Sequence, residues 1–183
     1  MTTNQTTNEL PSFRAENLKW LILTAIIIAL DLWTKQIASA ELDYARPVEI
    51  LPFLNFTLLH NPGAAFSFLS DAGGWQRWFF TAISLVASVV FLVWITRLKA
   101  SEKMLALSLA LILGGAVGNL YDRATLGYVV DFISVYYNDW YFPAFNIADA
   151  AISVGAVLVI YDMLFGQGSK SAALTGQAKG REI

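Results

Sequence analysis

The chain of 183 residues is 56% hydrophobic, only 14% of its residues are charged, and its formal net charge is −2. About a quarter of the residues in an ordinary soluble domain are charged, so this composition indicates a membrane protein and argues against a nucleic-acid partner. The chain has no cysteine and a single histidine, which excludes disulfides, a cysteine nucleophile and an HExxH zinc site.

The amino-terminal part combines a polar tail with a first apolar segment. Residues 1–16 are polar and rich in Thr and Asn, and we expect them to form a disordered tail. Residues 18–40 are long enough to cross a bilayer as a helix. The Ala-Ser-Ala near the end of this segment resembles a signal-peptidase cleavage site, but Asp31 and Lys35 precede it. We therefore favour a retained transmembrane helix over a removed signal peptide.

Three further apolar segments approach the length of a transmembrane helix, and they cover residues 75–98, 104–121 and 146–165.

The long connections between these segments carry signals of their own. In the first half of residues 47–69, apolar and polar residues alternate, which predicts one or two short strands. Its second half, "GAAFSFL", predicts a short helix or turn at the membrane interface. Residues 134–145 are dense in Tyr, Trp and Phe, which settle at the headgroup level. Residues 166–183 form a second polar tail.

Lysine and arginine gather on one side of this predicted bundle. Eight of the twelve basic residues flank the start of the first segment, the short 99–103 loop or the end of the fourth segment. Cytoplasmic flanks accumulate positive charge. Both termini are therefore predicted to be cytoplasmic, and both long connections are predicted to lie outside.

Three carboxylates interrupt apolar runs. Asp31 lies in "IIIALDLWTK", Asp131 in "GYVVDFISVYY" and Asp149 in "FNIADAAI". An ionised side chain in hydrocarbon costs several kcal/mol, so each carboxylate needs a partner or a function. The predicted topology places all three at one depth, near the outer interface, which favours a shared function.

Two neighbouring aspartates can hydrolyse a peptide bond, because like charges a few ångströms apart cannot both ionise. One then remains an acid while the other activates water. Asp131 and Asp149 are the best pair, since a short connection lets the chain fold back between them. Simpler interpretations stay open: Asp149 can complement a helix N-terminus capped by Asn146, Asp31 can neutralise Lys35, and Asp131 can lie in an aqueous loop.

Two further motifs supply polar groups at the same depth. In "GGAVGNLYDR", Gly114 and Gly118 predict close helix packing. The same motif then places an amide, a carboxylate and a guanidinium beside the proposed site, from Asn119, Asp122 and Arg123. We expect the guanidinium to orient a loop or a substrate carbonyl. The motif "HNPGAAFS" adds the amide of Asn61 and the flexible backbone of Gly63.

The blocks "DLWTK", "NPGAAFS", "GGAVGNLYDR", "VVDF" and "FNIADAAI", in this order, resemble the signature blocks of bacterial lipoprotein signal peptidase, or signal peptidase II. They extend from the first apolar segment to the fourth. By position, Asp131 and Asp149 match the catalytic pair of that family. Its other motif positions are matched by Asp31, Lys35, Asn61, Gly63, Asn119, Asp122, Arg123, Asn146 and Ala148.

The resemblance implies an all-α membrane protein with four transmembrane helices, a small β element and a short interfacial helix on the periplasmic side. The peptidase domain would cover residues 17–165, between cytoplasmic tails at 1–16 and 166–183. Such a protein is an aspartic endopeptidase of the bacterial inner membrane, with its active site near the periplasmic face.

The implied substrates are diacylglyceryl-modified prolipoproteins, cleaved before the lipidated cysteine by a water that the aspartate pair activates. Membrane lipids would surround the enzyme, and globomycin-type cyclic peptides would inhibit it. We expect no cofactor, no metal and a monomer.

Two other classes of membrane protein compete with this interpretation. A small proton- or ion-coupled transporter would spread charged residues through the membrane depth, with Asp162 as the candidate for a second site. A non-enzymatic assembly or chaperone protein would explain the aromatic residues and the small-residue motif but not the aspartates. A Ser–Lys dyad using Lys35 has no obviously paired serine.

The distribution of basic residues predicts the outcome of reporter fusions. A reporter fused to either terminus should report the cytoplasm, and a reporter inserted near Asp71 should report the outer side. A cytoplasmic signal from the Asp71 insertion would contradict this arrangement. A mature chain that begins at Glu41 would restore the interpretation as a cleaved signal peptide.

Overall fold

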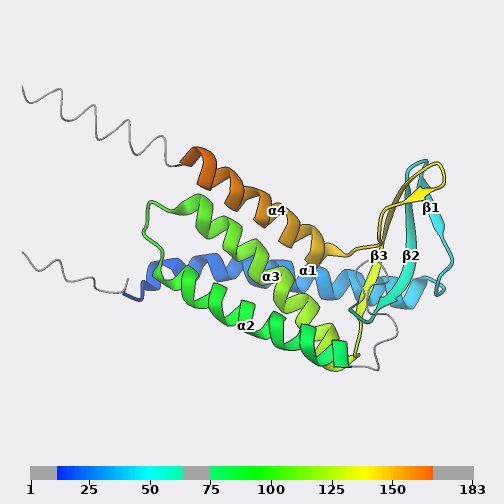
Figure 1. Cartoon of the computed structure of the whole chain (residues 1–183), viewed down its shortest axis with the longest axis horizontal. Coiled ribbons are helices and arrows are strands. Elements are labelled where there is room, and N and C mark those ends of the chain that lie inside the picture. The colour runs from blue at the N-terminus through cyan, green and yellow to red at the C-terminus, as the bar shows by residue number, and fades with distance from the viewer. Residues whose placement is uncertain (1–11, 64–74, 167–183) are drawn as a thin grey trace, which may run out of the picture.

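Four long helices form a bundle that carries a small sheet at one end (Figure 1). The structure is a computed structural model, and it describes residues 12–63 and 75–166. The helices are α1 (Trp20–Glu41), α2 (Trp75–Arg97), α3 (Lys103–Thr125) and α4 (Ile147–Tyr161). A 3₁₀ helix (Ala15–Lys19) precedes α1, and a π-helical turn (Asp162–Gly166) follows α4. Within the described residues, these four helical segments are long and apolar enough to cross a membrane.

The helix boundaries correct two sequence predictions. The helix α3 runs to Thr125, beyond the predicted end at residue 121, because Asp122 and Arg123 face partners inside the bundle rather than water. The predicted amino-terminal tail, residues 1–16, is too long, because the 3₁₀ helix already includes Ala15 and Glu16, and the Arg14 N–H donates to the Thr96 carbonyl at 2.8 Å. The remaining predicted tail residues, 1–11 and 167–183, and the predicted interfacial helix lie outside the described residues.

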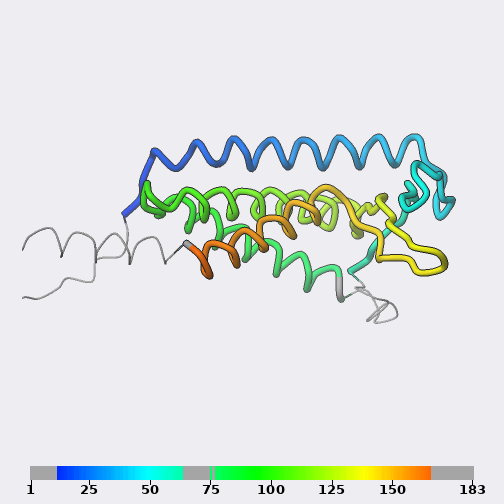
Figure 2. The backbone as a smooth tube through the Cα atoms, turned by 90° about the horizontal axis from the view of Figure 1, so that it is seen from above, coloured from blue at the N-terminus to red at the C-terminus, as the bar shows by residue number. Residues whose placement is uncertain are grey.

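The central helix is α3, which packs against each of the other three helices. Figure 2 shows α1 running along one side of α3 for its whole length. Glycines allow these close approaches: a Cβ on Gly114 would lie 2.7 Å from Ile27 Cβ, and a Cβ on Gly118 would lie 2.5 Å from Asp31 Oδ2. The predicted role of this small-residue face is therefore confirmed.

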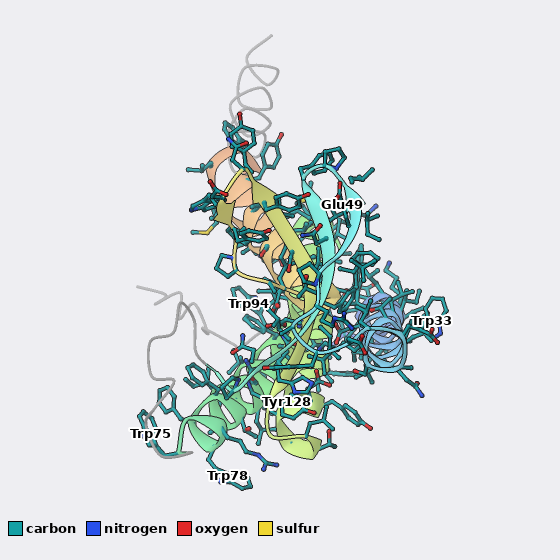
Figure 3. The ribbon with its side chains drawn as sticks, turned by 90° about the vertical axis from the view of Figure 1, so that its right-hand side faces the viewer. Trp33, Glu49, Trp75, Trp78, Trp94 and Tyr128 are labelled. Atoms are coloured by element: carbon teal, nitrogen blue, oxygen red, sulfur yellow. The ribbon has the colours of Figure 1, made fainter. Side chains whose placement is uncertain are left out.

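The outward faces of the helices are apolar. Val86 on α2 and Val157 on α4 are 62% and 64% exposed. Viewed from the sheet end, Trp33 lies on the side of α1 that is turned away from the other helices, and Trp75 and Trp78 lie on the outer side of α2 (Figure 3). A soluble protein rarely exposes so much contiguous apolar surface, so these faces fit contact with lipid.

The sheet has four antiparallel strands in the order β1-β2-β3-β4. They are β1 (Val48–Leu51), β2 (Leu54–Asn61), β3 (Val129–Tyr137) and β4 (Trp140–Tyr141). One or two short strands were predicted in the first half of residues 47–69, where β1 and β2 lie, but β3 and β4 were not predicted. Asp131 therefore lies on a strand, paired with Leu59 of β2, and not in an aqueous loop. The first four residues of β3 are buried, so the strand lacks the polar alternation by which a half-exposed strand is predicted.

Candidate active site

The site starts from a buried ammonium group on α1. Lys35 Nζ lies 2.7 Å from Asp31 Oδ2 and 2.9 Å from Asp122 Oδ2, and it donates to Asn119 Oδ1 at 3.0 Å. Asp31 precedes Lys35 by one turn of α1, while Asp122 and Asn119 belong to α3. A buried charge costs several kcal/mol unless it is paired and hydrogen-bonded. The cluster therefore fixes α1 against α3 in one register.

Both carboxylates of this cluster also hold backbone of neighbouring elements. Asp31 Oδ1 accepts from the Ala148 N–H at 2.9 Å, which satisfies one of the free donors in the first turn of α4. Asp122 Oδ2 accepts from the Val130 N–H at 3.1 Å, one residue before Asp131 on β3. Through these two bonds, Lys35 fixes the starts of α4 and β3 at once.

Asn146, the N-cap of α4, connects the two candidate catalytic aspartates. Its Nδ2 donates to Asp131 Oδ1 at 2.8 Å, and also contacts Asn119 Oδ1 and the Val130 carbonyl, each at 3.2 Å. Its Oδ1 accepts from the Asp149 N–H at 2.9 Å, while its own N–H donates to Asp149 Oδ2 at 3.3 Å. These last two bonds form a capping box. The capping role predicted for Asn146 is therefore confirmed, and the same side chain also orients Asp131.

Asp131 is the enclosed member of the pair, with 3% of its surface exposed. Its Oδ2 accepts from Asn61 Nδ2 of β2 at 3.1 Å. Burial, and next the negative charge of Asp149, raise the pKa of Asp131 from 3.8 to about 7, although the two amide hydrogen bonds and Lys35 oppose this shift. Near neutral pH, Asp131 is therefore available in its acid form.

Asp149 is the open member of the pair. Its Oδ1 accepts from Asn119 Nδ2 at 2.7 Å. Asp149 also lines a hollow of about 420 Å³, whose mostly apolar wall includes Phe142, Phe145 and Val154. One aspartate is thus enclosed in the protein and the other opens onto a cavity, which is the difference that separate acid and base roles require.

A second cation, Arg123, lies at the edge of the site. Its Nη1 donates to the Asn119 carbonyl at 3.4 Å, and its guanidinium carbon is 5.8 Å from the ring centre of Phe80. Its buried Nε has no hydrogen-bond partner among the described residues. This guanidinium therefore has donor capacity that no described residue uses.

The turn after β2 fixes the orientation of the Asn61 amide. The Gly63 N–H donates to Asn61 Oδ1 at 2.9 Å, so that the amide nitrogen faces Asp131. Gly63 has a φ of +105°, a conformation that favours glycine. The two groups predicted in "HNPGAAFS", the Asn61 amide and the Gly63 backbone, therefore work as one unit: the Gly63 N–H orients the amide that donates to Asp131.

All the residues singled out in the sequence come together at the sheet end of the bundle, and they are Asp31, Lys35, Asn61, Gly63, Asn119, Asp122, Arg123, Asp131, Asn146, Ala148 and Asp149. Their catalytic roles stay a prediction. His60 takes no part in this network, because its ring stacks on Tyr128 at 4.0 Å. Sequence reasoning missed Arg77 and Phe80 at the start of α2, although Arg77 is an isolated charge at the end of an apolar segment.

Comparisons with known proteins agree on one family. A family model described as signal peptidase (SPase) II matches residues 23–165. A lipoprotein signal peptidase of Acinetobacter baumannii is 57% identical over 165 residues, which cover 90% of this chain and 94% of that protein. A lipoprotein signal peptidase of Pseudomonas aeruginosa is 51% identical over 162 residues, which cover 87% of this chain and 96% of that protein.

A solved structure has the same fold. It is described as a bacterial membrane enzyme and superposes with a TM-score of 0.73 at 27% sequence identity. The match covers 88% of this chain and 96% of the other. The four-helix bundle with its small sheet is thus shared with an experimentally determined membrane enzyme.

The buried cluster around Lys35 predicts a large loss of stability when its cation is removed. Lys35→Met should leave Asp31 and Asp122 buried without their counter-charge and lower the free energy of unfolding by about 3–5 kcal/mol. Thermal unfolding of the purified protein in detergent measures this loss. Lys99→Met is the matched control, because Lys99 is exposed at the opposite end of the bundle. Equal melting temperatures for the two variants would contradict the structural role of the cluster.

Proposed function

Since this chain belongs to the signal peptidase II family of peptidases, we propose that it removes signal peptides from diacylglyceryl-modified prolipoproteins by cleaving before the lipidated cysteine. The observation that carries this proposal is the pair of unlike aspartates, Asp131 and Asp149, joined by the side chain of Asn146. A pair of this kind hydrolyses an amide without a covalent intermediate.

The different environments of the two aspartates support a different role for each. Asp149, open to the hollow, takes a proton from a water molecule while the water oxygen attacks the scissile carbonyl carbon. Asp131 gives its proton to the carbonyl oxygen, which its raised pKa of about 7 allows near neutral pH. The tetrahedral intermediate then collapses: the C–N bond breaks, and the proton held by Asp149 passes to the leaving nitrogen. As the C=O bond forms again, the hydroxyl that Asp131 had protonated returns its proton to Asp131, which restores the starting state of the pair. Arg123 orients the carbonyl oxygen through its free donors.

The location of the site suits a lipidated substrate. The hollow beside Asp149 has apolar walls and lies where α4 meets the sheet, so a diacylglyceryl group can stay in the membrane during cleavage. In this proposal the protein is an inner-membrane enzyme with both termini in the cytoplasm and its site near the periplasmic face. The retained first helix is required, because α1 supplies Asp31 and Lys35. The enzyme acts as a monomer, and globomycin-type cyclic peptides block the same hollow.

The aspartate pair predicts the effect of two isosteric substitutions. Asp131→Asn and Asp149→Asn should each lower the cleavage rate of a diacylated prolipoprotein by at least about 10²–10⁴-fold while the protein stays folded. Asparagine keeps the shape of the side chain but can neither take nor give the proton. The double variant should lose little more than each single variant, because residues that act as a unit are strongly non-additive.

Two control variants accompany this test. His60→Ala should keep substantial activity, because the His60 ring stacks on Tyr128 outside the network. Asp31→Asn should lower activity less than the two pair variants, because Asp31 acts through Lys35 and Ala148. Near wild-type cleavage by the 131 or 149 variant, or complete inactivity of a folded His60→Ala protein, would refute the assigned mechanism.

The raised pKa of Asp131 predicts how cleavage depends on pH. The mechanism needs the acid form of Asp131, which is present below its folded-state pKa and is lost as pH rises through about 7. The rate should therefore fall about tenfold per pH unit on the alkaline side, with an apparent pKa that belongs to the coupled pair. Single-turnover cleavage measured from pH 5.5 to about 9 tests this. A rate that stays constant or rises across pH 7 would show that Asp131 does not act as the acid.

A further inference from the structure

The first turns of α2 contact Arg123 at both its backbone and its side chain. Arg77 Nε donates to the Arg123 carbonyl at 3.0 Å, and Arg77 Nη2 donates to the Ala124 carbonyl at 2.9 Å. The last carbonyls of a helix have no partner within the helix. Arg77 therefore fixes the end of α3, where the backbone of Arg123 lies.

Phe80, almost one helical turn after Arg77, contacts the side chain of Arg123. The guanidinium carbon of Arg123 lies 5.8 Å from the centre of the Phe80 ring, within the range of a cation–π contact. The same ring packs against Gly63, because a Cβ placed on Gly63 would lie 2.5 Å from Phe80 Cδ2. Phe80 thus lies between Arg123 and the turn that orients the Asn61 amide toward Asp131.

The Arg123 guanidinium needs a contact that holds it away from the nearby carboxylates. The charges of Asp149, Asp131 and Asp122 all act on Arg123, and its one side-chain hydrogen bond within the described residues is a long contact of 3.4 Å to the Asn119 carbonyl. A direct, two-bond ion pair with Asp149 is the arrangement that a guanidinium and a carboxylate prefer. Such a pair would occupy the lone pairs with which Asp149 accepts a proton from water. The face of the Phe80 ring competes with the Asp149 carboxylate for the guanidinium, and the ring lies outside the aspartate pair.

We infer that Phe80 is a positioning residue that holds the Arg123 guanidinium beside the aspartate pair without allowing it to close onto Asp149. Arg77 fixes the backbone end of the same residue, and the free donors of Arg123 stay available for the scissile carbonyl. The inference rests on the proposed peptidase function and extends it to α2, which contributes no residue to the aspartate network described above.

The test compares Phe80 with its neighbour on the same helix. Phe80→Leu should lower kcat for a diacylated prolipoprotein about tenfold with little change in KM, because it removes the ring face but keeps an apolar side chain. Phe80→Tyr should restore most of the rate, because tyrosine provides the same face. Phe79→Leu is the matched control: Phe79 is 48% exposed on the outer surface of α2, and its ring contacts are with Trp75 and Phe80. Its kcat should stay near that of the wild type.

Each of the following results would overturn the inference that Phe80 positions Arg123. If Phe80→Leu and Phe79→Leu have equal kcat, or if Phe80→Tyr is as slow as Phe80→Leu, the ring face does not position Arg123. If Phe80→Leu lowers only the melting temperature, with kcat per folded molecule unchanged, Phe80 contributes packing alone. An inactive wild-type protein would refute the proposed function itself, whereas an active wild type with an unaffected Phe80→Leu variant would refute only the role of Phe80.

Discussion

The buried ion cluster of Lys35 is the interaction on which the rest of the site depends. One ammonium group is shared by Asp31, Asp122 and Asn119, and each of these three side chains has a second task. Asp31 holds the start of α4, Asp122 holds the start of β3, and Asn119 donates to Asp149. Removing a partner from such a cluster leaves an uncompensated buried charge, so its geometry is expensive to disturb. The enzyme thus gains a rigid frame at the end of a bundle whose outer faces are apolar.

The same frame explains why the two aspartates, Asp131 and Asp149, lie in different environments. Asp131 comes from a strand and is enclosed between Asn146 and Asn61, whereas Asp149 comes from a helix start and opens onto the hollow. Burial disfavours the ionised form of Asp131 more than the hydrogen bonds from Asn61 and Asn146 favour it, and the charge of Asp149 adds to the effect of burial. In the proposed mechanism, the fold separates the acid from the base by placing the two aspartates on different types of secondary structure.

The sequence was sufficient to predict the four helices and the three carboxylates Asp31, Asp131 and Asp149, because both leave strong local signals. Long apolar segments define the helices, and carboxylates within such segments are expensive enough to indicate a function. The strand that carries Asp131 was missed, because "VVDF" is buried on both faces and has no polar alternation. The positions of Arg77 and Phe80 were missed for another reason: their partner Arg123 lies about 45 residues later in the chain, and no local pattern encodes that contact.

The division of labour among the helices also follows from these contacts. The central helix α3 carries small residues where it meets α1 and α4, so that the backbones come close enough for Asp31 to reach the Ala148 N–H. A larger residue at Gly118 would meet the Asp31 carboxylate, so helix packing and the ion cluster constrain the same position. The helix α2 packs on α3 through residues such as Ile95, keeps exposed apolar side chains on its outer face, and contacts the site only through its first turns. Substitutions on the outer face of α2 beyond its first turns therefore leave the geometry of the aspartate pair unchanged.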